Sequence, residues 1–206
     1  MEHTNEYVYI CTMVDTREKI LGAMFKDIHK NGFQGLRADK VIKEMDVTKG
    51  ALYHYFPSKE AIGLAIIDEI IEPNYLKFYD DLDIFEGNPI DMLQFHLKDL
   101  SRYATDDDIS LGCPLNNLMQ EMSPINEDFR SKLKQVVEKM TISITNALEN
   151  GKVKNFVKKD IDAQAVAEFY FSGIEGSYSI AKVHRNAKMF KSNMKQLSLY
   201  LDILRG

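Results

Sequence analysis

The chain has 206 residues, of which 45% are hydrophobic, and it contains five prolines and no tryptophan. This length suits one compact unit or a small domain joined to a larger one, and the composition is ordinary for an all-helical soluble protein. Two cysteines, Cys11 and Cys113, are too few and too far apart for a disulfide framework or a zinc site. No run approaches the roughly 18 apolar residues of a membrane span, so we expect no membrane partner and a cytoplasmic location.

The net charge of −5 is unevenly distributed along the chain. Residues 15–60 hold nine Lys and Arg against seven Asp and Glu, a net charge of +2. The remaining residues hold 17 basic and 24 acidic side chains, a net charge of −7. This asymmetry is typical of a basic nucleic-acid-binding unit joined to an acidic body.

Three helices are predicted near the N-terminus, after residues 1–14, which we expect to be a flexible lead. The first covers residues 16–31, and Gly32 ends it as a C-terminal glycine does. The second covers residues 38–45 and is followed by a tight turn at residues 46–47. Thr48 can then cap the third helix through its hydroxyl.

The third helix has one apolar side and one polar side. Leu52 and Phe56 are four residues apart and share the apolar side, which we expect to face a core. Lys, Tyr and His side chains occupy the other side, which suits an anionic, flat partner such as double-stranded DNA. Two short helices joined by such a turn form a helix-turn-helix, whose second helix enters the major groove.

These residues carry a resemblance to a known family. The segments 32–33, 41–42, 47–56 and 59–62 resemble the DNA-binding domain of TetR-family transcriptional regulators. Two departures stand out, because Leu36 and Arg37 replace a usual threonine pair, and Met45 and Asp46 replace the usual alanine-glycine of the turn. Asp tolerates the left-handed conformation better than most residues, so we expect the turn to survive.

The resemblance implies an all-α fold with two domains. Residues 15–60 form a three-helix helix-turn-helix DNA-binding domain, and residues 61–206 form a larger helical domain for effector binding and dimerisation. The partners that it implies are palindromic double-stranded operator DNA, a small effector and a second copy of the chain. The implied phosphate contacts are Thr48, Tyr53, Tyr55 and Lys59, and the expected contacts to base edges are Lys49, Gly50 and His54. Arg37 could supply a phosphate contact in place of the missing threonine pair.

The rest of the chain also has helical spacing of apolar residues. A helix from residue 59 is expected to kink or end at Pro73. The acidic run 106–108 is expected to be a solvated loop and no metal site, since adjacent carboxylates need help from elsewhere to surround an ion. A later helix is expected to stop at Gly151. The last two helices are predicted over residues 162–184 and 188–204.

Large, pliable apolar side chains are unusually frequent in the middle helices. Met repacks easily and is common at permissive binding surfaces, so we predict a pocket for a small apolar effector there. Ordinary core packing would account for most of these residues one by one. The candidate ligand-binding residues are Phe78, Phe95, Tyr103, Cys113, Asn117, Met119 and Met122.

Cys113 lies in a Gly-Cys-Pro segment that is similar to one found in a subset of TetR-like regulators. A thiol at a helix N-terminus is expected to have a lowered pKa and could react with oxidants or electrophiles. The alternative is a buried structural cysteine.

The last two helices carry an apolar stripe with two small residues. Two such helices from each subunit can form an intermolecular four-helix bundle. The alternative is that the stripe belongs to the core of one subunit, but the family resemblance favours a dimer. The candidate interface residues are Phe169, Gly173, Gly176, Ile180, Val183, Leu197 and Leu201.

The predicted function is therefore a ligand-responsive DNA-binding transcriptional regulator, a repressor that a small apolar effector releases from its operator. One alternative is a helical ligand-binding dimer that no longer binds operator DNA, and another is a thiol-based regulator that senses oxidants or electrophiles through Cys113. No phosphate-binding loop, nucleophile elbow or paired-His motif is present, so we predict no enzyme activity, cofactor or metal.

Overall fold

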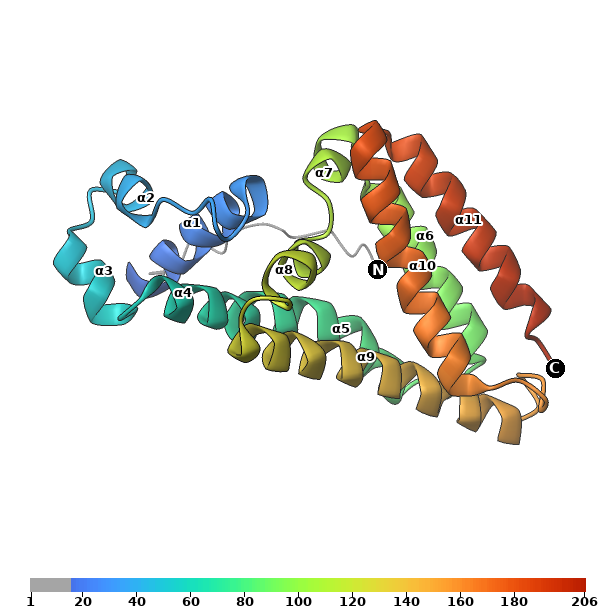
Figure 1. Cartoon of the computed structure of the whole chain (residues 1–206). Helices are drawn as coiled ribbons and strands as arrows, with labels where there is room; N and C mark the ends of the chain where they lie inside the picture. Colours follow the sequence, from blue (N-terminus) through green and yellow to red (C-terminus); the bar gives the residue numbers. More distant parts are fainter. Residues whose placement is uncertain (1–15) are drawn as a thin grey trace. The chain divides into compact units, whose positions relative to one another are not determined.

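The computed structural model describes residues 16–206 (Figure 1). The chain divides into two compact units between Ala65 and Ile66. Within the described residues every regular element is a helix, apart from one isolated bridge between Val157 and Arg205. The predicted all-α class is therefore confirmed. The predicted lead over residues 1–14, which includes Cys11, lies outside the described residues, and the predicted boundary at residue 60 stays a prediction.

The first unit holds four short helices around one small core. Gly32 ends the first helix with φ 78°, a left-handed conformation that suits glycine, and its N–H bonds to the Ile28 carbonyl at 2.8 Å. Asp46 has φ 56° in the turn before the third helix, as its replacement of glycine predicted. The helices are α1 (Thr16–Asn31), α2 (Ala38–Glu44), α3 (Lys49–Tyr55) and α4 (Lys59–Ile66).

The backbone stays helical beyond α4, although Pro73 was expected to disturb it. A π-helical turn, Ile67–Ile71, follows α4, and α5 (Glu72–Asp83) follows the turn. Pro73 is the second residue of α5 and follows a helical backbone, so its missing N–H leaves the preceding turn without one main-chain hydrogen bond. The disturbance therefore takes the form of a π-helical turn, which changes the helical register before the proline.

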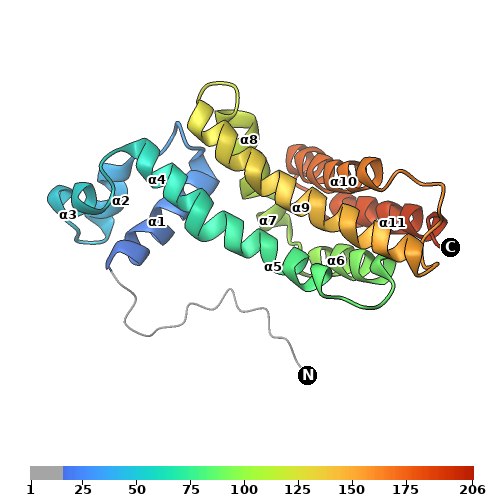
Figure 2. The same ribbon diagram turned by 90° about the horizontal axis from the view of Figure 1, so that it is seen from below.

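The second unit is a bundle of helices. In Figures 1 and 2, α5 lies beside α9, and α10 lies beside α11. α10 also packs on α9, and α11 packs on α6, so that apolar residues from all five helices share one core. The remaining elements are α6 (Pro89–Tyr103), α7 (Asp106–Leu111), α8 (Pro114–Met122), α9 (Glu127–Val153), α10 (Ala163–His184) and α11 (Ala187–Ile203).

The acidic run 106–108 is not a loop, and that prediction was wrong. It forms the first turn of α7, where carboxylates suit the positive end of the helix dipole. The Thr105 hydroxyl accepts from the Asp108 N–H at 3.1 Å, and the Asp108 carboxylate accepts from the Thr105 N–H at 3.2 Å. This reciprocal pair is a capping box.

Gly151 does not stop its helix either, because α9 continues to Val153. A Cβ on Gly151 would lie 2.7 Å from a methyl of Val157 and 2.8 Å from the Pro89 ring. Glycine is therefore required here for close approach of the chain after α9 and the start of α6.

Candidate functional site

Helix α3 is held by its cap and by its apolar side. The Thr48 hydroxyl accepts from the Ala51 N–H at 3.2 Å and so satisfies one of the N–H groups at the helix start. Leu52 and Phe56 are buried in the core of the first unit. The Arg17 guanidinium lies over the Phe56 ring, 4.9 Å from its centroid. The polar side of α3 is consequently kept outward.

The outward side of α3 carries the predicted base-contacting residues together. Lys49, Gly50 and His54 are exposed, as are Thr48 and Tyr53. Gly50 has no heavy atom closer than 3.9 Å to the position of an added Cβ, so the helix surface is low there and allows close approach by a partner. The Lys49 ammonium pairs with the Asp39 carboxylate of α2 at 2.5 Å, which raises the pKa of Lys49.

The predicted phosphate-contacting residues lie at the edges of this surface. Arg37 is exposed immediately before α2, and Tyr55 is half-buried with its ring 5.3 Å from that of His54. Lys59 is also half-buried, because its ammonium donates to the Gln34 carbonyl at 2.9 Å and lies over the Phe33 ring. A lysine held in this way presents its charge from a fixed position.

The second unit contains a cluster of aromatic rings around His96, in which Tyr79 and Tyr170 are buried and His96 and Phe78 are half-buried. The His96 ring stacks on Phe78 with centroids 4.0 Å apart. The Tyr170 hydroxyl donates to the Leu93 carbonyl at 3.1 Å, so it accepts from His96 Nδ1 at 2.9 Å. Burial lowers the pKa of His96 to about 4, and the ring is therefore neutral near neutral pH.

A second buried polar group surrounds Cys113, the N-cap of α8. The Asn116 N–H donates to Sγ at 3.4 Å, and the thiol donates to Glu175 Oε1 at 3.4 Å. The Tyr75 hydroxyl lies 3.0 Å from Sγ and, because the thiol proton is directed at Glu175, the hydroxyl donates to the sulfur. Asn116 also bonds to α10 through its side-chain amide, which donates to the Ser179 hydroxyl at 2.8 Å.

The predicted lowering of the Cys113 pKa is wrong. Burial, and after it the Glu175 carboxylate, raise the pKa of Cys113 well above its usual range. The N-terminus of a helix favours a thiolate, but Cys113 is 3% exposed and its sulfur faces an acidic side chain, and these two effects favour the neutral thiol. Burial likewise raises the pKa of Glu175 to about 7.

The predicted ligand-binding residues do not all lie together. Phe78, Cys113 and Met122 are buried or half-buried within the second unit. Phe95 is 60% exposed and Tyr103 is 37% exposed, so both have side chains at the surface of the unit. The remaining two are half-buried on α8, where Asn117 accepts from the Lys182 ammonium at 3.0 Å and Met119 lies two positions further on.

Sequence reasoning missed Glu175, Tyr75 and Tyr170 as members of this interior. Glu175 was open to detection, because it lies one residue after Ile174 and four after Phe171, on the buried side of α10. A lone acidic residue in that register indicates a special role. The tyrosines gave no such signal, since aromatic residues are common in cores.

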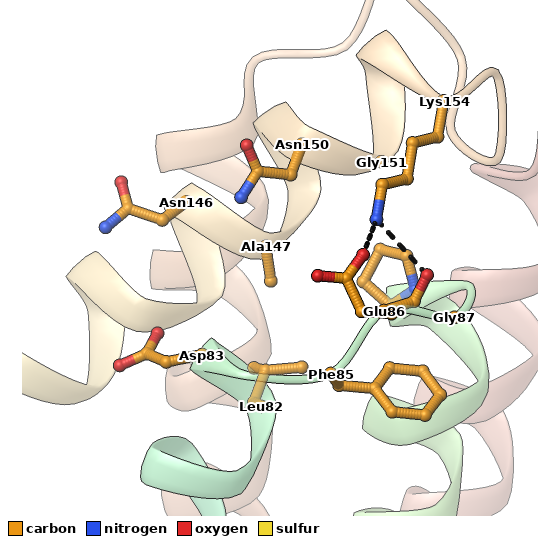
Figure 3. Close-up of a pocket in the computed structure, with 11 residues that line it drawn as sticks. Leu82, Asp83, Phe85, Glu86, Gly87, Asn146, Ala147, Asn150, Gly151 and Lys154 are labelled. Atoms are coloured by element: carbon orange, nitrogen blue, oxygen red, sulfur yellow. Dashed lines mark hydrogen bonds and ion pairs between the residues drawn. The ribbon is translucent and has the colours of Figure 1, made fainter.

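A small hollow lies elsewhere, at the end of the second unit where α5 and α9 approach each other (Figure 3). The Lys154 ammonium crosses its rim and bonds to the Glu86 carboxylate at 2.5 Å and to the Glu86 carbonyl at 3.2 Å. Its volume of about 80 Å³ is well below the few hundred Å³ of a typical ligand pocket. None of the predicted ligand-binding residues lines it. The lining residues are Leu82, Asp83, Phe85, Glu86, Gly87, Pro89, Asn146, Ala147, Asn150, Gly151 and Lys154.

The predicted dimer stripe divides into an exposed and a buried part. On α10, Phe169 is 52%, Ile180 54% and Val183 82% exposed. Gly176 lies between them, with open space where a Cβ would be. This set, with the exposed Leu199 and Ile203 of α11 added, is called the α10–α11 apolar face below.

The other three stripe residues pack inside the subunit, in contrast to their predicted place at an interface. Leu201 has no exposed surface and Leu197 is 7% exposed. Gly173 faces Leu197, whose Cδ2 would lie 3.1 Å from an added Cβ. The reason is that α11 packs against both α10 and α6, so its inner leucines fill the space between those helices.

The described residues contain neither a membrane-spanning helix nor a metal-binding cluster. Between Thr16 and Gly206 no helix combines the length and the apolar character needed to cross a membrane. In the same residues no three His, Cys, Asp or Glu side chains are grouped so that they could hold a metal ion.

Comparison with known proteins identifies the family. Residues 20–66 match "Bacterial regulatory proteins, tetR family", and residues 89–197 match "Tetracyclin repressor-like, C-terminal domain". The chain is 29% identical over 183 residues to an uncharacterized HTH-type transcriptional regulator of Lactococcus lactis, covering 89% of this chain and 91% of that one. It is 32% identical over 139 residues to the HTH-type transcriptional repressor NemR of Escherichia coli, covering 67% and 69% respectively.

The fold agrees with this assignment. The crystal structure of E. coli NemR in its reduced form matches with a TM-score of 0.77 at 26% identity, and the match covers 94% of this chain and 98% of that one. The chain is therefore a member of the TetR family of bacterial transcriptional regulators, with an N-terminal helix-turn-helix and a larger helical C-terminal domain, and it is not an enzyme.

Proposed function

We propose that this regulator is a repressor whose dimer binds a palindromic operator and leaves it when a small, largely apolar effector binds the second unit. The observation that carries the proposal is that the two units of the chain have different surfaces and interiors. One unit presents a capped helix with an outward polar side, and the other encloses a buried polar cluster in an apolar interior. We propose that the regulator acts in the cytoplasm, where bacterial operator DNA lies.

DNA recognition is proposed to follow from the outward side of α3. Lys49 can donate to guanine in the major groove, and Gly50 lets the helix approach the bases closely. Arg37, Thr48, Tyr53, Tyr55 and Lys59 surround this centre and are proposed to contact phosphates. In a symmetric dimer, the two α3 helices would lie about 34–36 Å apart or at a multiple of that spacing, to meet successive major-groove segments.

The test is a selection of operator sequences from random DNA, followed by mobility-shift titrations. Lys49→Ala should weaken binding to the selected operator more than binding to unrelated DNA, by a factor that corresponds to about 1–3 kcal/mol. Lys134→Ala is a matched control, since its side chain is 61% exposed, against 67% for Lys49, and it lies in the second unit. Equal loss in both variants would contradict the base contact, and failure to select any operator would favour a ligand-binding dimer that no longer binds DNA.

Lys59 tests the phosphate assignment separately. Lys59→Ala should weaken binding to operator and to unrelated DNA alike and should lower the salt slope by about one. An unchanged salt slope would show that the ammonium serves only its bonds to Gln34 and Phe33 within the first unit.

Dimerisation is proposed to occur through the α10–α11 apolar face. The large apolar side chains of this face are 50% or more exposed in one subunit, and a contiguous apolar patch is costly to leave in water. Two copies of the face would form a four-helix bundle around a two-fold axis, with Gly176 allowing close approach.

Control by the effector requires two conformations. The effector must bind more tightly to the conformation that fits DNA poorly, and operator DNA must weaken effector binding by the same factor. A coupling of about 1–3 kcal/mol is typical and sufficient to lower operator occupancy. The helical backbone from α4 through the π-helical turn to α5 crosses from one unit to the other and is the proposed route of transmission. A compound that binds in calorimetry but leaves operator affinity unchanged would refute this account.

Thiol sensing is a second candidate function, favoured by one contact. The Cys113 thiol donates to the Glu175 carboxylate, a group that can accept the proton when the sulfur attacks an electrophile. In this case Cys113→Ser should abolish release of DNA by an electrophile such as N-ethylmaleimide and leave operator affinity intact. Release of the Cys113→Ser variant at the normal rate would exclude it.

A further inference from the structure

Glu175 is a buried carboxyl group with only one weak partner. Its side chain is 8% exposed on α10, and Oε1 accepts only the Cys113 thiol, at 3.4 Å. Oε2 is buried and has no hydrogen-bond partner among the described residues. A buried polar atom without a partner is costly, and in native structures it commonly marks a place where water, an ion or a ligand binds.

The groups that face Glu175 do not supply a positive charge. Tyr75 and Tyr79 come from α5, Cys113 comes from the start of α8, and Asn116 bonds to the Glu175 backbone carbonyl at 3.3 Å. Lys182, two turns further along α10, donates instead to Asn117 at 3.0 Å. A buried carboxylate normally has a cation as its partner, and the contacts of the Glu175 side chain among the described residues include none.

Tyrosines of α5 lie near this carboxyl group, because the Tyr75 hydroxyl contacts the same Cys113 sulfur that bonds to Glu175. Burial, and after it the Glu175 carboxylate, raise the pKa of Tyr79, so this phenol lies within electrostatic reach of Glu175. The Tyr79 ring contacts Phe78 and His96, with centroids 5.1 Å and 5.9 Å apart, and thereby extends the aromatic surface deeper into the unit. Aromatic faces attract organic cations, most strongly where water is excluded.

We propose that Glu175 is the charged contact of the effector site and that the effector is an organic ammonium, an apolar body carrying one protonated amine that donates to Oε2. This inference rests on the proposed function, because it assigns a chemical class to the effector. The apolar body would lie against the rings of Tyr75 and Tyr79, and the ammonium would complete the bonds of the carboxylate.

The burial of Glu175 would also make such a ligand bind one conformation of the second unit more tightly than another. Because the side chain is 8% exposed, an ammonium reaches Oε2 only when the helices around it separate. The ligand therefore prefers a more open conformation of the second unit over the closed one, and a difference in affinity between conformations is what shifts a population.

The experiment uses the full-length dimer at about pH 8 and three probes of similar shape: 2-phenylethylamine, 2-phenylethanol and 3-phenylpropanoate. Calorimetry and thermal shift should show the amine binding at least about tenfold more tightly than the alcohol, since only the amine brings a charged donor. The carboxylate should bind most weakly. An equal or reversed preference in the unmodified protein would overturn the inference without any variant.

Glu175→Gln then locates the preference. This variant should lose at least about tenfold in amine affinity, while alcohol affinity changes little. Glu168→Gln is the matched control, because Glu168 lies on the same helix and is exposed to solvent. Unchanged amine binding by the Glu175→Gln variant would also overturn the inference.

Operator release is measured separately so that the two proposals can fail independently. If the amine binds through Glu175 but leaves operator affinity unchanged, the ligand class stands and the switching proposal falls. If a neutral apolar compound releases the operator and the amine does not bind, the switching proposal stands and the ammonium inference falls.

Discussion

Replacement of Glu175 by glutamine should change how the stability of the protein depends on pH. Burial raises the pKa of Glu175 from 4.5 to about 7, so between these values the folded protein holds a proton that the unfolded chain has lost. Stability must therefore fall as the pH rises through this window, and the loss is complete above the folded pKa. Glutamine keeps the shape of the side chain and cannot ionise, so the variant should not show this loss.

The magnitude follows from the size of the pKa difference. The difference between a pKa of 4.5 and one of about 7, at about 1.36 kcal/mol for each pH unit, corresponds to about 3 kcal/mol at high pH. Most of it, about 2–3 kcal/mol, develops between about pH 5 and about pH 8, by the linkage relation for these two pKa values. His96, whose pKa is lowered to about 4, makes the protein lose stability as the pH falls below 6.5, but it is present in both proteins and cancels in their difference.

The assay is urea unfolding of both proteins across this pH range at one fixed subunit concentration, because the stability of a dimer depends on concentration. The free energy of unfolding of Glu175→Gln minus that of the unmodified protein should rise by about 2–3 kcal/mol from the acidic to the alkaline end. Glu168→Gln, exposed on the same helix, should give a difference that barely changes. A flat difference for Glu175→Gln would refute the buried, poorly partnered state of this carboxyl group.

Three further changes test other parts of the molecule. Val183→Asp should raise the dimer dissociation constant at least about a hundredfold, and light scattering should then report monomer mass. Val153→Asp is the control, because Val153 lies on α9 with the same 82% exposure, and this variant should leave the dimer intact. Asp39→Asn should tighten operator binding in mobility shifts at low salt, because Lys49 loses a competing partner and a negative charge near the DNA is removed. A gain in affinity that persisted at high salt would contradict this electrostatic reason. Leu201→Ala should lower the free energy of unfolding by about 2–5 kcal/mol in urea titrations, since the side chain is fully buried, and a loss near zero would show that Leu201 is not core.

Local features of the first unit could be predicted correctly from the sequence alone. The glycine that ends α1, the left-handed Asp46 and the Thr48 cap each depend on a residue and its immediate neighbours. The burial of Leu52 and Phe56 follows from their spacing of four on one short helix. In such cases the determining interactions lie within a few residues along the chain.

Some local patterns were present in the sequence and were interpreted wrongly. Thr105 and Asp108 have the spacing of a capping box, yet three successive acidic residues suggested a loop. Glycine commonly ends a helix, but at Gly151 the close approach of Val157 and Pro89 requires a glycine within the helix instead. The contact with Pro89 could not be predicted from the sequence, because Pro89 is far from Gly151 along the chain.

The sequence by itself determined the helical class, the helix-turn-helix and the apolar sides of the helices, because helical periodicity and capping act over one or two turns. Only the tertiary structure decided which apolar residues face a neighbouring helix and which face outward. Leu201 and Val183 occupy similar positions in a periodic apolar pattern, but Leu201 has no exposed surface and Val183 is 82% exposed. It also decided the state of Cys113. The helix start favours a thiolate, but Glu175, brought to within 3.4 Å by packing of α10 against the second unit's interior, together with burial, keeps the thiol neutral.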